Sequence, residues 1–397
     1  MKTLSCFFLA LIFSAAASGA QQRVDLGDVT VGINKSVVQV RVSASTPELN
    51  ALAQLAFSAH GRYKVVSSGH VFDIKFTAVG GTQVRVDITK GLGGSPVASE
   101  TVTGTSARNA LLRAADIAVE KTNGLGLKGF FASKITFIRD QGSVKEVCTA
   151  DLFFGEAKQL THQNALALMP RWTPDGAKIV YTSFYKSGFP DIYLLDAASG
   201  RPETFVSVKG TNQGARFSPN GQQVAMVLSG EGTPEIYVSN AQGRQISRKT
   251  RSDQVKSSPC WSPDGSRLVF TMEPGPQLYV MSAAGGTPQR LASGYSYTAE
   301  PDWSRANPQK IACTVRVPGN RYQIAVYDFS KGKAEVVSKA EFDGVEPSWL
   351  PDGRHLVYTA RDRNSSVLSI LDTETGNSRR ISATNLGPVA QGNVWGR

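Results

Sequence analysis

The segment Trp261-Ser262-Pro263-Asp264-Gly265 is the clearest copy of a motif that recurs along most of this 397-residue chain. The other copies, some of them altered, are Trp172-Thr173-Pro174-Asp175-Gly176, Phe217-Ser218-Pro219-Asn220-Gly221, Trp303-Ser304-Arg305-Ala306-Asn307-Pro308, Trp349-Leu350-Pro351-Asp352-Gly353 and a lone Trp395. Their leading aromatic residues are spaced 45, 44, 42, 46 and 46 positions apart. A repeat of this length is typical of a propeller or a solenoid.

Each copy of the motif describes the tip of a β-hairpin. The aromatic residue ends one strand, proline presets φ for the turn, Asp or Asn bonds to nearby backbone, and glycine takes a positive φ. A β-rich run follows every complete or altered copy, at 178–182, 224–228, 268–272, 311–315 and 356–360. The motif therefore predicts one hairpin in each repeat.

A second series of turns runs out of phase with the first and ends at Gly155, Gly200, Gly243, Gly286, Gly332 and Gly376. Two turn types in each repeat of about 44 residues indicate four strands, which is one blade of a propeller. The stretch 135–161 lacks a first strand, and Val394-Trp395 is a first strand without a blade. We therefore predict a six-bladed β-propeller of four-stranded antiparallel blades, closed by the C-terminal strand, because a linear array would leave exposed edges.

The length and the N-terminal composition predict three segments: a signal peptide at 1–20, a small α+β domain at 21–130, and the propeller at 131–397. An apolar run from Cys6 to Ala17 is too short to span a bilayer, and small residues precede Gln21, so cleavage is expected after Ala20. The mature chain is expected to lie outside the cytoplasm, with no membrane-inserted segment.

The α+β domain is predicted from short patterns. A helix is expected to start at Pro47, a second to run from Ser106 to Asn123, and two alternating strands to cover 72–76 and 84–88. The first fifteen residues after the cleavage site show no strong periodicity, and we expect them to form a mobile N-terminal segment.

Composition argues against several classes of function. The net charge is +11, but no basic run carries interleaved aromatic residues, so nucleic-acid binding is not expected. Three cysteines of the mature chain, Cys148, Cys260 and Cys313, fall in or beside predicted strands, where buried thiols are expected. The sequence contains no CxxC pair, so it does not predict a zinc site.

The sequence also offers no clear catalytic group. The four histidines, His60, His70, His162 and His355, are scattered, so ordinary surface or turn histidines are expected rather than a metal or catalytic cluster. The motif itself accounts for the carboxylates of Asp175, Asp264 and Asp352. No nucleophile elbow or phosphate-binding loop is present, and no cofactor is predicted.

The whole layout resembles the TolB family of the Tol–Pal envelope system. The resemblance includes the small domain before the ring, Leu168-Met169 before Pro170, the segment 286–291, and the closing Val394-Trp395. It implies a monomeric, non-enzymatic periplasmic adaptor. In that family the mouth of the ring binds Pal, a peptidoglycan-associated lipoprotein, and the N-terminal segment contacts TolA of the inner-membrane complex. The system supports outer-membrane integrity and cell division, and colicins exploit the same surface for import.

Partner contacts are expected in the loops just ahead of each innermost strand, because these loops converge at one end of the channel. The candidate residues are Thr211, Asn212, Gln213, Gly214, Lys256, Ser257, Ser258, Ala299, Glu300 and Glu346. Members of the family often carry histidine where this chain has Thr211 and threonine where it has Ser257. We assign the TolA contact to residues 21–34 as a whole.

Two alternatives remain open at this stage. A secreted propeller enzyme, such as a lyase, could use Glu300 and Glu346 as an acid–base pair. A glycan-binding propeller would need exposed aromatic residues at the mouth, for which Tyr295 and Tyr297 are the candidates.

Overall fold

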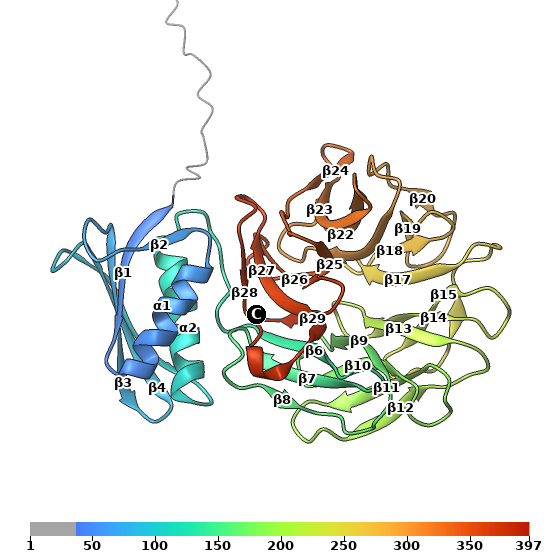
Figure 1. The fold of residues 1–397 in the computed structure, drawn as a ribbon, viewed down its shortest axis with the longest axis horizontal. Helices are drawn as coiled ribbons and strands as arrows, with labels where there is room; N and C mark the ends of the chain where they lie inside the picture. The colour runs from blue at the N-terminus through green and yellow to red at the C-terminus, as the bar shows by residue number, and fades with distance from the viewer. Residues whose placement is uncertain (1–36, 397) are drawn as a thin grey trace, which may run out of the picture. The chain divides into compact units, whose positions relative to one another are not determined.

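The computed structural model describes residues 37–396. The predicted signal peptide and the segment 21–34 lie outside the described residues. The described chain forms one five-stranded sheet with two helices, followed by six four-stranded sheets (Figure 1). Among these residues, neither helix has the length and apolar character needed to cross a bilayer.

The first sheet has the order β2-β1-β3-β4-β5. Its strands are β1 (Val38–Ala44), β2 (Tyr63–Val65), β3 (Phe72–Gly80), β4 (Gln83–Lys90) and β5 (Pro96–Thr103). The two predicted strands are confirmed as β3 and β4, which pair antiparallel. β1, β2 and β5 were not predicted, although Val38, Val40 and Val42 alternate along β1 and could have revealed it.

Both predicted helices are confirmed as α1 (Pro47–Ala59) and α2 (Ala107–Thr122). Each begins behind a hydroxyl cap: Thr46 Oγ1 accepts from Leu49 N at 3.3 Å, and Ser106 Oγ accepts from Asn109 N at 3.1 Å. These bonds satisfy backbone donors that the first helical turn leaves free. The apolar faces of both helices are buried in one core with the sheet.

The six further sheets are the blades of a propeller, and their strands follow one another in chain order in blades 1 to 5. Blade 1 contains β9 (Ala167–Trp172), β10 (Lys178–Ser183), β11 (Asp191–Asp196) and β12 (Pro202–Val206). Blade 2 contains β13 (Asn212–Phe217), β14 (Gln223–Leu228), β15 (Glu235–Asn240) and β16 (Ser247–Arg248). Blade 3 contains β17 (Lys256–Trp261), β18 (Arg267–Met272), β19 (Gln277–Ser282) and β20 (Gln289–Arg290).

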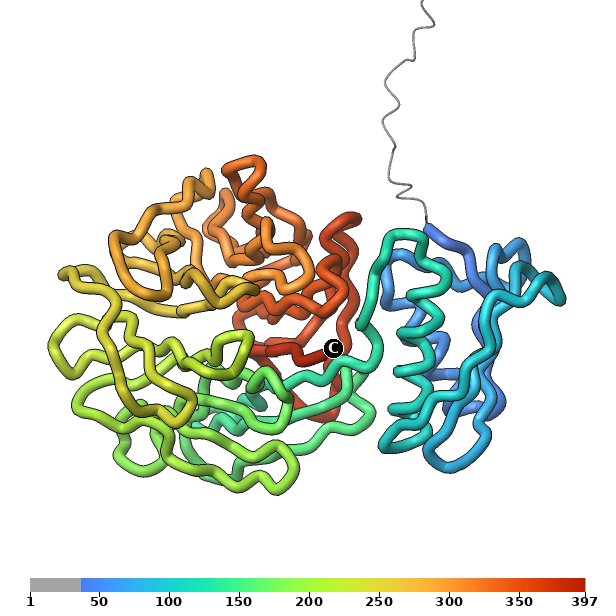
Figure 2. Tube along the Cα trace, turned by 180° about the vertical axis from the view of Figure 1, so that it is seen from behind, coloured from blue at the N-terminus to red at the C-terminus, as the bar shows by residue number. Residues whose placement is uncertain are grey.

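Blades 4 and 5 continue the pattern around the ring, and Figure 2 shows the chain passing through them from orange to red. Blade 4 contains β21 (Thr298–Trp303), β22 (Lys310–Val317), β23 (Arg321–Asp328) and β24 (Lys333–Val336). Blade 5 contains β25 (Asp343–Trp349), β26 (His355–Arg361), β27 (Ser366–Asp372) and β28 (Ser378–Arg380). Every predicted β-rich run lies in the second strand of its blade.

Blade 6 joins the two ends of the propeller and confirms the predicted closure. It contains β29 (Val389–Trp395), which follows a short 3-10 turn (Thr384–Leu386), and then β6 (Lys134–Asp140), β7 (Lys145–Asp151) and β8 (Lys158–Gln159). β29 pairs antiparallel with β6, so the last strand of the chain is the first strand of this blade (Figure 1).

The closing strand holds one difference from the predicted repeat. In blades 1 to 5 the aromatic residue ends the first strand at a constant structural position, such as Trp349 opposite Leu356. In blade 6 that position belongs to Val394, opposite Ile135, and Trp395 lies one residue further along. The indole of Trp395 instead reaches blade 1, where its Nε1 donates to Pro174 O at 3.0 Å.

The three described cysteines are free and buried, as predicted. Burial raises the pKa of the Cys148 and Cys313 thiols to about 12, so both stay protonated and unreactive at neutral pH.

Candidate functional site

The innermost strands of all six blades share one backbone irregularity. One residue in each strand adopts a left-handed conformation, with φ between 52° and 64°, where the pairing with the second strand shifts register. We call these residues the bulge ring: Met169, Gly214, Ser258, Glu300, Glu346 and Gln391. A bulge re-aims a side chain, and all six residues line one cavity at the propeller channel.

Side chains of the bulge ring connect neighbouring blades. A carboxylate oxygen of Glu300 accepts a hydrogen bond from Glu346 N at 2.9 Å, and Glu346 in turn accepts from Gln391 N at 3.0 Å. Gln391 Oε1 then accepts from Met169 N at 2.7 Å, across the closure of the ring. Each acceptor satisfies a backbone N–H that a bulge leaves without a strand partner.

The two glutamates of this ring are held by further donors. Thr314 Oγ1 donates to Glu300 at 2.6 Å, and Thr359 Oγ1 donates to Glu346 at 2.7 Å. Burial, followed by repulsion from Glu346, raises the pKa of Glu300. The structure therefore brings these carboxylates close together, but each of them also takes part in the bonds between blades.

A second ring lies two residues further along the same strands and comprises Arg171, Arg216, Cys260, Asp302, Ser348 and Asn393. We call it the inner polar ring. Four of its members accept a hydrogen bond from a first-strand N–H of the next blade: Cys260 Sγ from Trp303 at 3.3 Å, Asp302 from Trp349 at 2.7 Å, Ser348 from Val394 at 3.1 Å and Asn393 from Trp172 at 2.9 Å. The two arginines cannot accept and face the channel cavity instead.

The ten predicted contact residues divide into three groups. Gly214, Ser258, Glu300 and Glu346 belong to the bulge ring and line its cavity. Thr211, Gln213 and Ser257 are half-buried beside it. Asn212, Lys256 and Ala299 are buried.

Two of the buried residues organise the loops internally. Asn212 Nδ2 donates to Val208 O at 2.8 Å, and its Oδ1 accepts from Val208 N at 3.1 Å. Lys256 Nζ lies 3.0 Å from a Glu235 carboxylate oxygen, and both side chains are buried. These two side chains shape the loops rather than face a partner.

Exposed apolar side chains gather at the same end of the propeller. Loops that lead into a first strand emerge at the same end of a blade as loops between the second and third strands. Five large side chains in such loops are 39% to 69% exposed: Tyr185, Phe189, Val208, Val255 and Phe342. We call them the apolar mouth residues. They were not among the predicted contacts, although an apolar residue inside a polar loop was a visible signal.

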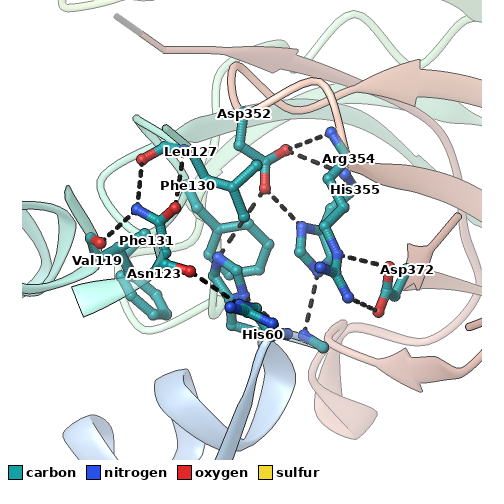
Figure 3. A network of polar contacts seen from close by, with 12 residues as sticks. His60, Val119, Asn123, Leu127, Phe130, Phe131, Asp352, Arg354, His355 and Asp372 are labelled. Carbon is teal, nitrogen blue, oxygen red and sulfur yellow. Dashed lines mark hydrogen bonds and ion pairs between the residues drawn. The ribbon is translucent and has the colours of Figure 1, made fainter. Parts of the chain in front are cut away.

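A second candidate site contains two of the histidines that were expected to be ordinary surface or turn residues (Figure 3). That expectation was wrong for His60 and His355, which are fully buried with ring centroids 4.5 Å apart. With Asp352 they place three potential metal-ligating atoms within 4.8 Å of one another. Chain folding alone brings them together, because they are almost 300 residues apart in sequence.

Backbone donors determine the tautomers of both histidines and make this cluster a poor metal site. Gly61 N donates to His355 Nε2 at 3.1 Å, so the proton of His355 is on Nδ1, 2.6 Å from Asp352. Arg62 N donates to His60 Nδ1 at 3.2 Å, so the Nε2 that faces Asp352 at 4.0 Å carries hydrogen. The atoms that face the carboxylate are therefore N–H groups and not free lone pairs.

Asp352 occupies the motif position at which other blades form an ordinary turn. Asp175 accepts from Thr173 Oγ1 at 2.6 Å, and Asp264 accepts from Ser262 Oγ at 2.5 Å. Blade 5 carries Leu350 where blades 1 to 4 have a Ser or Thr hydroxyl, so Asp352 has no hydroxyl donor at this position and accepts a hydrogen bond from His355 instead. This departure in the motif was the sequence signal for the cluster.

The buried imidazole of His60 predicts a pH dependence of stability. Burial, reinforced by His355 and Arg354, lowers the pKa of His60 well below its ordinary value of 6.5. Below pH 6.5 the unfolded chain therefore binds a proton at this histidine that the folded chain does not bind. The free energy of unfolding should accordingly fall as the pH is lowered. Compared with His60→Asn, the wild type should lose more stability between pH 7.5 and 5.5, by up to about 1.4 kcal/mol.

Chemical denaturation at a series of pH values measures this difference. Burial also raises the pKa of Asp116, to about 6, which stabilises the folded state as the pH falls. That opposite contribution is present in both proteins and cancels in the comparison. Parallel stability curves for the two proteins would contradict the prediction.

Comparison with known proteins relates the chain to TolB propellers. The family model of the TolB beta propeller domain matches residues 122–397. A protein TolB homolog from Chlorobium chlorochromatii is 33% identical over 145 residues, covering 36% of this chain and 32% of the relative. The Tol-Pal system protein TolB of Bordetella pertussis is 28% identical over 274 residues, covering 68% of this chain and 61% of the relative. The matched part thus spans less than two thirds of either relative.

A solved structure extends the likeness of fold beyond the propeller. The crystal structure of TolB from Acinetobacter baumannii superposes with a TM-score of 0.79 at 24% identity, covering 90% of this chain and 96% of that chain. The α+β region and the propeller therefore occur together in a protein of the same fold.

Proposed function

Because the chain belongs to the TolB β-propeller family, we propose that it is a non-enzymatic periplasmic adaptor of a Tol–Pal-type system. Its propeller mouth would bind the periplasmic domain of a Pal-like peptidoglycan-associated lipoprotein. Residues 21–34 would contact a TolA-like inner-membrane protein. Together these contacts would support outer-membrane integrity and cell division.

The observation that carries this proposal is the composition of the mouth. The apolar mouth residues are exposed in loops at one end of the blades, and Glu300, Glu346 and the rest of the bulge ring line a cavity in the channel. Exposed apolar side chains together with a polar depression suit a protein partner, which can bury the former and place hydrogen-bonding groups in the latter.

The enzyme and glycan-binding alternatives gain less from the structure. Glu300 and Glu346 accept hydrogen bonds that connect the blades, so using them as acid and base would disturb the ring. The ring of Tyr297 packs edge-on against Tyr322 at 5.1 Å, and Tyr295 packs on the core of blades 3 and 4. We therefore favour the adaptor.

Calorimetric titration of residues 21–397 with the periplasmic domain of the organism's Pal-like lipoprotein tests the proposal. We expect saturable binding that the double variant Thr211→Arg/Ser257→Arg weakens by at least about tenfold, because two bulky cations would enter the contact surface.

The matched control is Gln222→Arg/Ser266→Arg, which adds the same charges to the exposed hairpin tips at the opposite end of the same two first strands. It should bind like the wild type. No binding by the unmodified protein would refute the adaptor role, whereas equal losses in both double variants would refute the mouth as its site.

A further inference from the structure

The fourth copy of the sequence motif is altered at one decisive position. The other four turns carry Pro174, Pro219, Pro263 and Pro351 after the aromatic residue and its neighbour, but blade 4 carries Arg305. The channel cavity formed by the inner polar ring is lined by Pro219, Pro263, Pro351 and Arg305 at this level. The altered motif therefore adds a cation to the rim of the cavity.

This cavity has a volume of about 300 Å³ and an excess of positive charge. Its charged lining consists of Arg171, Arg216 and Arg305 with a single carboxylate, Asp302. Three guanidinium groups and one carboxylate leave two positive charges uncompensated. An excess of positive charge in a recessed cavity favours the binding of an anion.

Both oxygens of Asp302 already have partners other than Arg171 and Arg305. One of its oxygens pairs with Arg216, whose Nη1 also donates to Pro301 O at 3.3 Å. The other oxygen accepts from Trp349 N at 2.7 Å. Asp302 is therefore committed to Arg216 and to the bond between blades 4 and 5.

Arg171 and Arg305 lack partners of their own. Across residues 37–396, neither guanidinium group takes part in a hydrogen bond or an ion pair. Burial, followed by repulsion from Arg216, lowers the pKa of the half-buried Arg171 to about 10. Arg305 is exposed at the rim of the cavity, whereas Arg171 is a recessed cation without a partner among these residues, and an anion would recover the free energy that this costs.

A neutral donor completes the cavity. Ser348 Oγ accepts from Asn393 Nδ2 and from Val394 N, both at 3.1 Å. Its acceptor positions are therefore occupied, and its own proton is free to donate into the channel.

We propose that the inner polar ring and Arg305 form a binding site for a phosphate group. Two unpaired guanidinium groups suit its charge of about −1.5 to −2 at neutral pH, and their planar donors match tetrahedral oxyanions. Ser348 supplies a further hydrogen bond. This site is centred on the inner polar ring, whose Arg171 and Arg216 also line the cavity of the bulge ring, and phosphate binding there does not require a protein partner.

Calorimetric titration of residues 21–397 with inorganic phosphate, and separately with glycerol phosphate, tests the site at constant ionic strength. We expect saturable binding, with no comparable response to chloride. Equal binding of both probes would mean that the site takes the phosphate group of a larger ligand, whereas binding of inorganic phosphate alone would mean that it takes the free ion. Absence of saturable binding with both would overturn the proposal.

Two variants locate the site. Arg171→Gln removes the recessed cation, and Arg305→Pro restores the motif of the other four turns. Each should weaken phosphate binding at least about tenfold, since each removes a charge-assisted hydrogen bond. The control Arg244→Gln removes an equally charged but exposed side chain and should bind normally. Unchanged affinity in both cavity variants, with thermal unfolding confirming that they are folded, would also overturn the proposal.

Discussion

Deletion of residues 391–397 is expected to lower the free energy of unfolding of the whole propeller by about 5 kcal/mol or more. The deletion removes most of β29, so blade 6 loses its inner strand and β6 becomes an exposed edge. It also removes the bonds from Gln391 to Met169 N and from Asn393 to Trp172 N, which close both rings onto blade 1. Each lost hydrogen bond costs about 1 kcal/mol, and each lost apolar side chain about 2 kcal/mol.

Thermal and urea unfolding of the truncated and full-length proteins measure this effect. The control Arg379→Ala alters β28, an outermost strand, where the exposed side chain makes no bond between blades and little change is expected. A peptide of residues 387–397, added in trans, should restore part of the lost stability, because it supplies the missing strand. Identical transitions for the truncated and full-length proteins would disprove the closure mechanism.

Asp352→Asn should destabilise the protein by about 3 kcal/mol, although it changes a single atom. One Asp352 oxygen accepts from Arg354 N and His355 N at 3.1 and 3.0 Å, and the other accepts from His355 Nδ1 at 2.6 Å. An asparagine amide must direct its NH₂ group at one of these donor sets. Buried N–H groups would then face each other without an acceptor, which costs about 1–3 kcal/mol for each group.

The matched control for this variant is Asp264→Asn at the same motif position of blade 3. Asp264 is exposed, and blade 2 already carries Asn220 there, accepting from Ser218 Oγ at 2.8 Å. We expect a change within about 0.5 kcal/mol for the control. If denaturant unfolding gave equal losses for the two variants, Asp352 would be an ordinary turn residue.

The repeat predicted the blades because its information is local. A turn motif such as Trp261 to Gly265 specifies its own hairpin through backbone preferences, and the phase of the glycine turns specified the closure. Strands with weak patterns were missed: in β5 only Val102 is buried, so the sequence of this strand has no apolar face to detect. In blade 6 the spacing between Trp349 and Trp395 matched the repeat, so Trp395 was the expected aromatic residue of the motif. In the structure Val394 occupies that position and Trp395 lies one residue further along.

The candidate sites were predictable only in part. The loops ahead of the first strands located the mouth, and four of the predicted residues do line its cavity. Burial of Asn212 and Lys256 could not be foreseen, because it depends on how the loop around Val208 folds back on Asn212 and on Glu235, the first residue of β15. The apolar mouth residues were overlooked because single exposed apolar residues are common on protein surfaces.

By itself, the sequence determined the number of blades, the closure by the last strand and the end of the ring at which loops converge. These properties follow from periodicity and turn chemistry, which act over a few residues. Only the tertiary structure decided which polar groups meet. Segments far apart in the chain converge to bring His60 close to His355 and to pair Asp302 with Arg216. The same convergence leaves the guanidinium group of Arg171 without a hydrogen-bond partner among the described residues of the channel cavity. Each of these outcomes depends on competition for hydrogen bonds among all neighbouring groups.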